Sequence, residues 1–474
     1  MADSTTTVPE MADDDGGLKR SITGTQLFFY TLGDVLGSGI YVLIGLVAAA
    51  VGGAFWIAFA AGVTVAAITG SAYAELVTKY PQAAGSSLYV QKAFGNRPLT
   101  FLVTVSFLAA SFAASGSLAT GFASYFSELF DGGGPPALLV SLAFVAMLVF
   151  INFLGITESV VMNMVMTFIE LSGLLIVMII AVYYIGQGNA DFGTLTDISV
   201  SGNPALAVLA GVALSFFAMT GFENTANVAE ETIDPYRAFP RSLIGGMIVA
   251  GLVYVLVSMA AALTVPTDKL AESDVALLEV VKQGILPFST ELMTTVFTII
   301  ALVAITNTTL VTLVTQPRIL YGMAREDVVP GVFAKIHPTR RSPWVGLLFS
   351  GLVVGALLVT GYAVTAAGGG IDLVNRLALV TVVFLLAIYA LVIVTCLKLR
   401  GRDEDERAFR ANTPLLLVGL VGNLAILYYV IYDDPASLLW CAGLLAVGGA
   451  LFAAEHVFGS RGTDSTAPAL EKEI

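Results

Sequence analysis

The stretch TLGDVLGSGIYVLIG, residues 31–45, determines how the rest of the chain is interpreted. It lies in an apolar segment long enough to cross a membrane, yet its middle is Gly37, Ser38 and Gly39. Glycine costs about 1 kcal/mol relative to alanine in a helix interior, so two glycines around a serine weaken the helix there. In hydrocarbon, the backbone groups freed by a break are tolerated only where they are buried in protein or line a cavity. The stretch therefore predicts a broken transmembrane helix that contacts something polar; close packing of helices through small residues is the alternative.

The composition places the chain among polytopic membrane proteins. Of its 474 residues 57% are hydrophobic and only 12% are charged, and the mean hydropathy is +0.87, whereas a soluble domain usually carries about 25% charged residues. The first 17 residues are polar and acidic, so we expect no cleavable signal peptide. Cys396 and Cys441 lie inside apolar segments without partner spacing, which predicts neither a disulfide framework nor a metal cluster.

A membrane span needs about 20 mostly apolar residues. Twelve such segments are predicted, at residues 26–50, 54–79, 98–127, 136–155, 159–185, 204–230, 240–264, 289–320, 343–362, 371–399, 413–432 and 435–457. The predicted fold is thus an all-α membrane protein with twelve transmembrane helices. It divides into a disordered acidic tail (1–21), spans one to five (22–202), spans six to ten (203–400), spans eleven and twelve (401–458) and a disordered polar tail (459–474).

The positive-inside rule predicts the orientation. With a cytoplasmic N-terminus, 19 of the 22 Lys and Arg fall on the cytoplasmic side. Lys269 and Lys282 fall outside, in the longest external loop, and Arg376 lies near the outer end of span ten. We therefore expect a multi-pass protein of the cytoplasmic membrane with both termini in the cytoplasm.

Span six carries a second interruption. In LAVLAGVALSFFAMTGFENTANVAEE, the residues from Ala218 to Gly221 interrupt an apolar run, and the sequence beyond them is markedly polar. If ten spans form two halves of five, spans one and six are the first spans of oppositely oriented halves. Corresponding interruptions in two inverted halves point to a transport site near the midplane of the membrane. Half-helix N-termini there suit a carboxylate, and unwound carbonyls suit an ammonium group, so an α-amino acid presents both partners.

Four motifs resemble the amino acid–polyamine–organocation (APC) transporter family. They are GDVLGSGIYVLIG (33–45), YAELVTKYPQAAGSSLYVQKAFG (73–95), SFFAMTGFENTANVAEE (215–231) and RILYGMARED (318–327). The motifs follow the expected order, and the similarity spans about residues 22–435. The resemblance includes cationic amino acid transporter-like members. It implies a LeuT-type 5+5 inverted-repeat fold with two extra helices, and secondary active transport of amino acids or related amines.

The resemblance also implies a substrate site. The substrate carboxylate would lie on the unwound turn of span one, and the α-amino group would face carbonyls of spans one and six. Phe217 matches the aromatic position that caps the substrate, although an ordinary core or lipid-facing phenylalanine is the alternative. The substrate-binding residues so implied are Leu36, Gly37, Ser38, Gly39, Ile40, Phe217, Ala218 and Gly221.

Ionisable residues inside spans are costly, at about 2.5–3.5 kcal/mol at the bilayer centre, and each asks for a reason. Glu170 lies 12 residues into span five, near the midplane, where some relatives carry a lysine. A carboxyl there could carry the coupling proton or contribute to a cation site; a neutral core glutamate is the alternative. Asp34 precedes the first break, and Glu223 matches an acidic family position linked to inner gating or proton release. Glu223 could instead be an acid wetted by an inner vestibule.

Three further expectations concern polar residues near the span ends and in span eight. Glu75 is predicted to be solvated at the inner end of span two. Asp372 and Arg376, four residues apart, are expected to pair on one helix face. In span eight, Thr308 and Thr309 could offer hydroxyls to a sodium ion, although threonines in helices more often bond to their own backbone. The small residues Ser106, Ala110, Ala114 and Ser117 of span three share a face that would leave room for a substrate side chain.

The leading hypothesis is secondary active transport of an amino acid by alternating access, with proton coupling favoured over sodium. An exchanger of an amino acid for an amine remains open, as does a sensor that binds an amino acid without net transport. An enzyme is disfavoured because no nucleophile–base or metal motif is present, and no P-loop indicates ATP hydrolysis. Beyond H+ or Na+, no cofactor, resident metal or nucleic-acid partner is predicted. The expected partners are an amino acid or amine and the lipid bilayer; the oligomeric state is not predicted.

Overall fold

The computed structural model describes residues 22–82, 85–130, 134–154, 159–198, 203–229, 232–325, 329–340, 342–370, 372–402 and 405–458. The two predicted disordered tails lie outside these residues. The principal helices are α1 (Gly24–Leu36), α2 (Ser38–Val51), α3 (Trp56–Lys79), α4 (Gly85–Phe94), α5 (Arg97–Ser127), α6 (Ala137–Leu154), α7 (Ser159–Gly186), α8 (Pro204–Ala218), α9 (Phe222–Thr225), α10 (Pro235–Thr264), α11 (Thr267–Glu272), α12 (Ala276–Lys282), α13 (Thr290–Arg325), α14 (Trp344–Val364), α15 (Leu373–Leu399), α16 (Thr413–Asp433) and α17 (Ser437–Phe458).

Eleven helices of the described chain are long and apolar enough to span a membrane. They coincide with the first eleven predicted segments, and α1 with α2 and α8 with α9 count as one interrupted span each. The twelfth segment forms α17, of which the apolar helix Ser437–Leu451 lies within the part of the chain described in full. The polytopic all-helical architecture is therefore confirmed, while the count of twelve spans stays a prediction.

The spans begin where the sequence carries helix-capping signals. Asn96, Asn203 and Asn412 precede α5, α8 and α16, and each side chain accepts a hydrogen bond from a backbone N–H of the first turn. A proline stands in the first two positions of each of these helices. Asparagine satisfies an otherwise unpaired N–H, and proline has no N–H to lose there. These caps define where the polar loops end and the apolar spans start.

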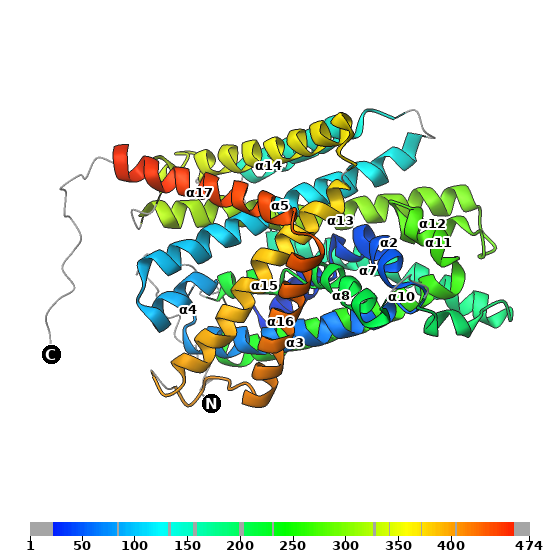
Figure 1. Ribbon diagram of the computed structural model, residues 1–474, viewed down its shortest axis with the longest axis horizontal. Coiled ribbons are helices and arrows are strands. Elements are labelled where there is room, and N and C mark those ends of the chain that lie inside the picture. Colours follow the sequence, from blue (N-terminus) through cyan, green and yellow to red (C-terminus); the bar gives the residue numbers. More distant parts are fainter. Residues whose placement is uncertain are drawn as a thin grey trace, which may run out of the picture.

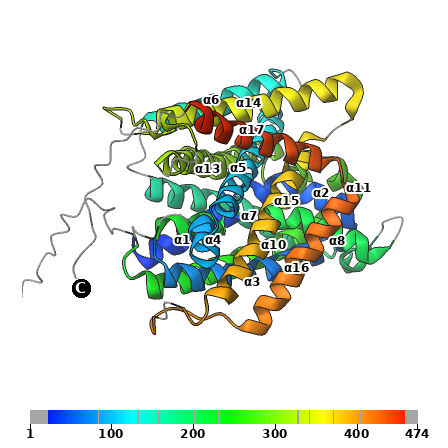
Figure 2. The ribbon, with the colours of Figure 1, turned by 60° about the vertical axis from the view of Figure 1, so that its left-hand side comes forward.

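The interrupted spans lie in the middle of the bundle. In Figure 1, α14 and α17 run along the upper side and α3 along the lower side, with α2, α7 and α8 between them. The helix α1 packs against α10, α2 packs against α8, and α5 packs against α13 and α15. Figure 2, turned by 60°, shows α5 and α7 near the centre of the view and α16 at its edge. Each break is thus surrounded by other helices, as freed backbone groups in a membrane require.

Two ion pairs correct the expectations for the span ends. Glu75 is 6% exposed and accepts two hydrogen bonds from Arg400, at 2.9 and 2.7 Å, so it is a buried structural partner and not a solvated acid. Arg376 pairs with Asp434 and not with Asp372. The Asp372 side chain instead caps α15 by accepting from the Asn375 N–H.

We predict that Arg400→Ala lowers the thermal stability of the protein. Its guanidinium joins α3 to the loop after α15, and Glu75 on α3 would be left buried without its counter-ion. Removing one partner of a buried pair costs about 3–5 kcal/mol. A melting curve of the detergent-solubilised protein measures the change, with Arg407→Ala as the control because the Arg407–Asp405 pair is exposed. Equal melting temperatures for the two variants would contradict this role.

Candidate functional site

The first break separates α1 from α2 at Gly37, whose φ of −37° and ψ of −151° are not helical. A Cβ atom at this position would lie 1.9 Å from Thr308 Oγ1 of α13, so no larger residue fits. The Ser38 N–H donates to Thr308 Oγ1 over 3.0 Å. The threonine hydroxyl thus satisfies one of the N–H groups that the start of α2 leaves unpaired.

The second break lies between α8 and α9. The N–H groups of Met219 and Thr220 tighten the end of α8 by bonding to the Phe216 and Phe217 carbonyls. Gly221 then takes a φ of +119°, which L side chains rarely adopt. A Cβ there would also lie 2.8 Å from the Asp34 carbonyl oxygen. Glycine at this position therefore permits both the backbone turn and the approach of α1.

The two breaks meet in the centre of the molecule. A Cβ on Gly39 would lie 2.4 Å from the Ala218 Cα, which shows how closely α2 approaches the end of α8. The Tyr254 hydroxyl of α10 joins both breaks, because it lies 2.5 Å from the Val35 carbonyl oxygen and 3.1 Å from that of Ala218. Sequence reasoning missed Tyr254; the only signal was a tyrosine in the middle of an apolar span.

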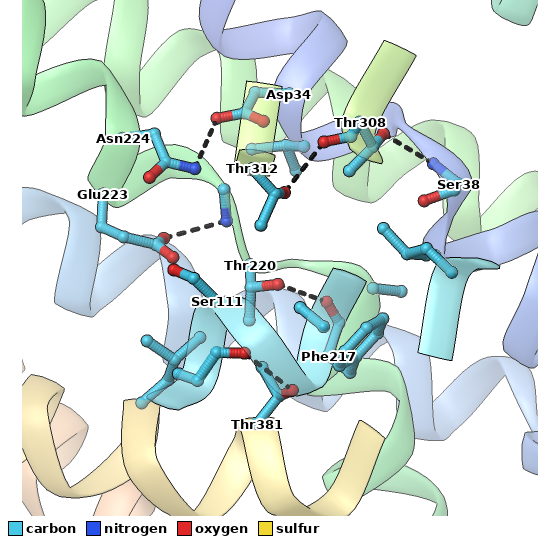
Figure 3. Close-up of a pocket in the computed structure, with 18 of the residues that line it drawn as sticks. Asp34, Ser38, Ser111, Phe217, Thr220, Glu223, Asn224, Thr308, Thr312 and Thr381 are labelled. Atoms are coloured by element: carbon cyan, nitrogen blue, oxygen red, sulfur yellow. Dashed lines mark hydrogen bonds between the residues drawn. The ribbon is translucent and has the colours of Figure 1, made fainter. Parts of the chain in front are cut away.

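A cavity opens beside the breaks (Figure 3). The space between its lining atoms, part of it open to solvent, is about 520 Å³. Its walls combine both breaks with α5, α13 and α15, and they mix apolar surface with hydroxyl, amide and carboxyl groups. The principal lining residues are Asp34, Ser38, Gly39, Phe107, Ala110, Ser111, Ala114, Phe217, Ala218, Thr220, Gly221, Glu223, Asn224, Thr308, Thr312, Thr381 and Leu385.

Most of the predicted site residues border this cavity. Of the substrate-binding set, Ser38, Gly39, Phe217, Ala218 and Gly221 line it. The remaining three, Leu36, Gly37 and Ile40, lie in the break or next to it but are not lining residues. The α5 face contributes Ala110 and Ala114, whereas the Ser117 hydroxyl turns to the Val374 carbonyl at 2.9 Å. Thr312 and Thr381 were missed, since isolated threonines in apolar spans carry little signal.

Asp34 and Glu223 face the cavity from opposite sides of Gly221. The Glu223 carboxyl accepts from the Gly221 N–H at 2.9 Å, and the Asp34 carboxyl accepts from the Asn224 amide at 3.2 Å. Their exposed fractions are 2% for Asp34 and 5% for Glu223. None of the described residues that line the cavity is Lys, Arg or His.

Glu170 lies behind the first break, in a separate polar cluster. Its side chain is fully buried and accepts from the Asn307 amide at 3.0 Å, while Asn163 donates to Asn307 at 3.3 Å. In the described part of the chain, Glu170 Oε2 and Asn163 Oδ1 have no hydrogen-bond partner. Glu170 does not line the cavity, and Asn307 was not anticipated from the sequence.

The two threonines of α13 are placed differently. Thr308 lines the cavity and accepts from Ser38, whereas the Thr309 hydroxyl donates to the Ile305 carbonyl of its own helix at 2.6 Å. Thr309 thus follows the alternative in which a helical threonine bonds to its own backbone, and its side chain does not line the cavity. The sodium site predicted for these two hydroxyls stays a prediction.

We predict that Thr308→Val lowers transport about tenfold while Thr309→Val leaves it near the unmodified level. Valine keeps the shape of threonine but leaves the Ser38 N–H without an acceptor, and an unpaired buried donor costs about 1–3 kcal/mol. Initial uptake rates of the two variants, normalised to protein in the membrane, provide the test. Similar rates for both would remove Thr308 from the site.

Hydrogen bonds and ion pairs link neighbouring parts of the chain near the C-terminal end of α5. The Tyr125 hydroxyl of α5 donates to the Tyr41 carbonyl of α2 at 2.9 Å. Beyond it, Lys282 binds Glu128 at 2.7 Å and Glu279 at 3.2 Å, and Lys269 binds Glu279 at 2.9 Å. Partial burial by itself raises the pKa of Glu279, but the two lysines lower it below its ordinary value. Both lysines of the predicted external loop are therefore neutralised by acids.

These features define a polytopic membrane protein with a cavity at the junction of two broken spans. The amino acid permease family matches residues 22–452, and the chain belongs to this family. The match confirms the family expected from the four motifs. Family members of this kind are permeases, which also confirms that the chain is not an enzyme.

Individual relatives cover most of the chain at low identity. The branched-chain amino acid permease of Bacillus subtilis is 25% identical over 430 residues, covering 87% of each protein. The methylthioribose transporter of the same bacterium is 25% identical and covers 88% of this chain and 89% of that protein. Cationic amino acid transporter 9 of Arabidopsis thaliana is 29% identical over 68% of this chain and 58% of that protein.

A solved structure shares the fold. A manganese transporter from Eremococcus coleocola superposes with a TM-score of 0.58 over 96% of this chain and 97% of that chain, at 14% identity. At this identity the likeness concerns the arrangement of the helices alone.

Proposed function

We propose that this chain is a secondary active transporter that carries amino acids across the cytoplasmic membrane by alternating access. The observation that carries the proposal is the meeting of two helix breaks at a cavity lined by both apolar and polar groups. The start of α2 offers the positive end of a helix dipole and the Ser38 hydroxyl to a carboxylate. The carbonyls at the end of α8 and the acids beyond them suit an ammonium group. Phe217 would cap the bound substrate.

The position of the cavity along α5 supports alternating access. With both termini in the cytoplasm, α5 runs from the inner side at Arg97 to the outer side at Ser127. The cavity borders α5 at Phe107 to Leu118, and the Tyr125–Tyr41 hydrogen bond lies beyond it towards the outside. This state would therefore release substrate to the cytoplasm, and the outer hydrogen bond would open in the alternate state. The LeuT-type pairing of spans one to five with six to ten provides the two halves for such a motion.

Proton coupling is favoured over sodium. Glu170 offers a buried carboxyl oxygen without a partner in the described residues, and a buried charge needs a proton or a counter-ion.

Uptake of a panel of radiolabelled amino acids into proteoliposomes tests the proposal, with a proton or a sodium gradient imposed in turn. Accumulation driven by the proton gradient is the expected result, and accumulation driven by sodium would correct the coupling ion. Uptake only into vesicles preloaded with an amino acid or amine would establish an exchanger. Binding without flux under every condition would overturn transport in favour of a sensor.

A further inference from the structure

A second cavity lies away from the helix breaks, between α17 and the helices α5, α13 and α14 (Figures 1 and 2). Its described lining residues are all Val, Leu, Ala, Phe, Met or Gly, and they include Leu108 of α5, Leu320 of α13, Phe349 of α14 and Leu444 of α17. The space between its lining atoms, part of it open to the outside of the molecule, is about 330 Å³. A water molecule needs about two to four polar partners, which these side chains do not offer. The cavity therefore suits a hydrocarbon group.

The helix α17 packs closely on α5 but leaves this space beside the contact. A Cβ on Gly448 would lie 2.2 Å from Val105 Cγ1, so the two helices meet there without room for another group. Val447, the neighbour of Gly448, lines the cavity and is 37% exposed, so the cavity reaches the surface of the bundle. In a membrane, lipid acyl chains cover that surface. A chain that entered the cavity would restore the dispersion contacts that an empty space loses.

The cavity lies towards the cytoplasmic side in the predicted orientation. Leu320 and Met323 belong to the last two turns of α13, and Phe349 belongs to the second turn of α14. The loop that joins these two helix ends contributes Val329 to the lining. The Phe333 ring of the same loop packs edge-on against the Phe349 ring, with their centroids 5.2 Å apart. The loop therefore borders the cytoplasmic end of the cavity.

This loop is basic in an otherwise acidic protein. The whole chain has a net charge of −13, yet residues 328–371 contain no Asp or Glu. In the same stretch the loop carries Lys335, Arg340 and Arg341. Basic residues next to the cytoplasmic ends of membrane helices attract anionic lipid headgroups. The charge of the loop thus complements an anion at the end of the cavity.

Lys335 is the basic residue of the loop that follows most closely on a cavity contact. It is exposed and lies two residues beyond Phe333, and the nearby Val332 and Ile336 are 41% and 44% exposed. Exposed apolar side chains beside a lysine are typical of a segment at the level of the headgroups. We propose that an anionic phospholipid of the cytoplasmic leaflet binds here, with one acyl chain in the cavity and its phosphate group at Lys335. This site is separate from the cavity at the two breaks, so it does not depend on the transported substrate.

Titration of the purified full-length protein in detergent with dioleoylphosphatidylglycerol tests the proposal, with bound lipid counted by native mass spectrometry. Dioleoylphosphatidylcholine carries the same chains without a net charge, and inorganic phosphate supplies the anion without chains. The anionic lipid is expected to bind at least about fivefold more tightly than phosphatidylcholine. An excess of inorganic phosphate is expected not to displace it; displacement would show a phosphate site and overturn the role of the acyl chain.

A substitution that fills the cavity tests the position of the chain. Ala109 of α5 lines the cavity and is 2% exposed, so Ala109→Leu places additional atoms in the space. It is expected to weaken the binding of both lipids at least about fivefold. The matched control is Ala446→Leu, which makes the same change at an exposed position of α17 that does not line the cavity. If Ala109→Leu is not recovered folded, Val447→Phe carries the test.

A substitution in the loop tests the position of the headgroup. Lys335→Gln keeps a long polar side chain but removes the charge, and it is expected to weaken phosphatidylglycerol binding about fivefold while phosphatidylcholine binding changes less than about twofold. Arg402→Gln is the control, because Arg402 is an exposed basic residue of the loop after α15. That control is expected to change neither affinity more than about twofold.

Each remaining outcome contradicts a stated part of the proposal. Equal affinities for the two lipids, or phosphatidylglycerol binding that Lys335→Gln leaves unchanged, would overturn the headgroup assignment. Binding that neither Ala109→Leu nor Val447→Phe weakens would show lipid held elsewhere on the surface and overturn the cavity as the site. Absence of any bound lipid would overturn the whole proposal. Amino acid uptake is not among these measurements, so a failure of the proposed function would leave the result intact.

Discussion

Replacement of Gly39 by leucine is expected to reduce amino acid uptake to background while the protein still reaches the membrane. Already a Cβ at this position would lie 2.4 Å from the Ala218 Cα and 2.8 Å from its Cβ. The obstacle is backbone, which cannot rotate away as a flexible side chain can. Since α2 and α8 meet here, the added atoms would push the two breaks apart and displace Ser38 and Phe217 from the cavity. Overpacking of this kind costs about 1–3 kcal/mol or more.

Uptake into proteoliposomes and the amount of protein in the membrane are measured together for this variant. Gly449→Leu is the matched control, because a Cβ at Gly449 of α17 meets nothing within 4 Å. That control is expected to transport at nearly the unmodified rate. Normal uptake by the Gly39 variant would contradict the assignment of the site to the two breaks. The same experiment with Ser38→Trp places a bulky ring in the cavity itself, and uptake is again expected to be lost.

The breaks and the spans were predictable because their causes are local. Apolar length is sufficient to identify a membrane helix. Gly37 and Gly221 indicate the positions of the breaks in the sequence itself, since glycine alone lacks the Cβ that would clash there. From two such breaks a site near their junction was predicted without knowledge of any contact, and a cavity borders both breaks. The family match over residues 22–452 then confirms the motifs on which the resemblance rests.

The polar contacts were not predictable because their partners are distant in sequence. The Tyr254 hydroxyl meets the Val35 carbonyl 219 residues away, and Arg400 meets Glu75 across 325 residues. For Arg376, the local rule for pairs four residues apart favoured Asp372. That rule failed because Asp372 caps α15, and Asp434 of the neighbouring helix end provides the counter-ion. Local spacing shows which residues can meet, and tertiary packing decides which do.

Glu170→Gln is expected to preserve substrate binding but abolish accumulation driven by a proton gradient. Glutamine has nearly the same volume as glutamate and keeps the carbonyl oxygen that accepts from Asn307. Its amide nitrogen takes the place of Glu170 Oε2, which has no hydrogen-bond partner in the described residues. The substitution therefore leaves the packing between α7 and α13 intact and removes only the ability to bind and release a proton.

The position of Glu170 links this chemistry to the break. Its backbone carbonyl accepts from the Tyr41 hydroxyl of α2 at 2.7 Å, and its side-chain partner Asn307 precedes Thr308, which holds the Ser38 N–H. Asn307, which binds the Glu170 carboxyl, is therefore the sequence neighbour of Thr308, whose hydroxyl accepts from the N–H group at the start of α2. We therefore expect protonation of Glu170 and the geometry of the proposed substrate site to be coupled through α13.

Two measurements on the same proteoliposomes separate a coupling role from a structural one. Substrate affinity is measured without a gradient, where Glu170→Gln is expected to stay within about twofold of the unmodified protein because the hydrogen bond to Asn307 is kept. Uptake is then measured across a range of pH differences, where the variant is expected to give a flat response. Glu272→Gln, an exposed glutamate of α11, is expected to keep the full response. If Glu170→Gln still accumulates substrate in proportion to the gradient, Glu170 is a neutral core residue and another group carries the proton. Asp34 and Glu223 are then the next candidates, because both are buried acids that line the cavity.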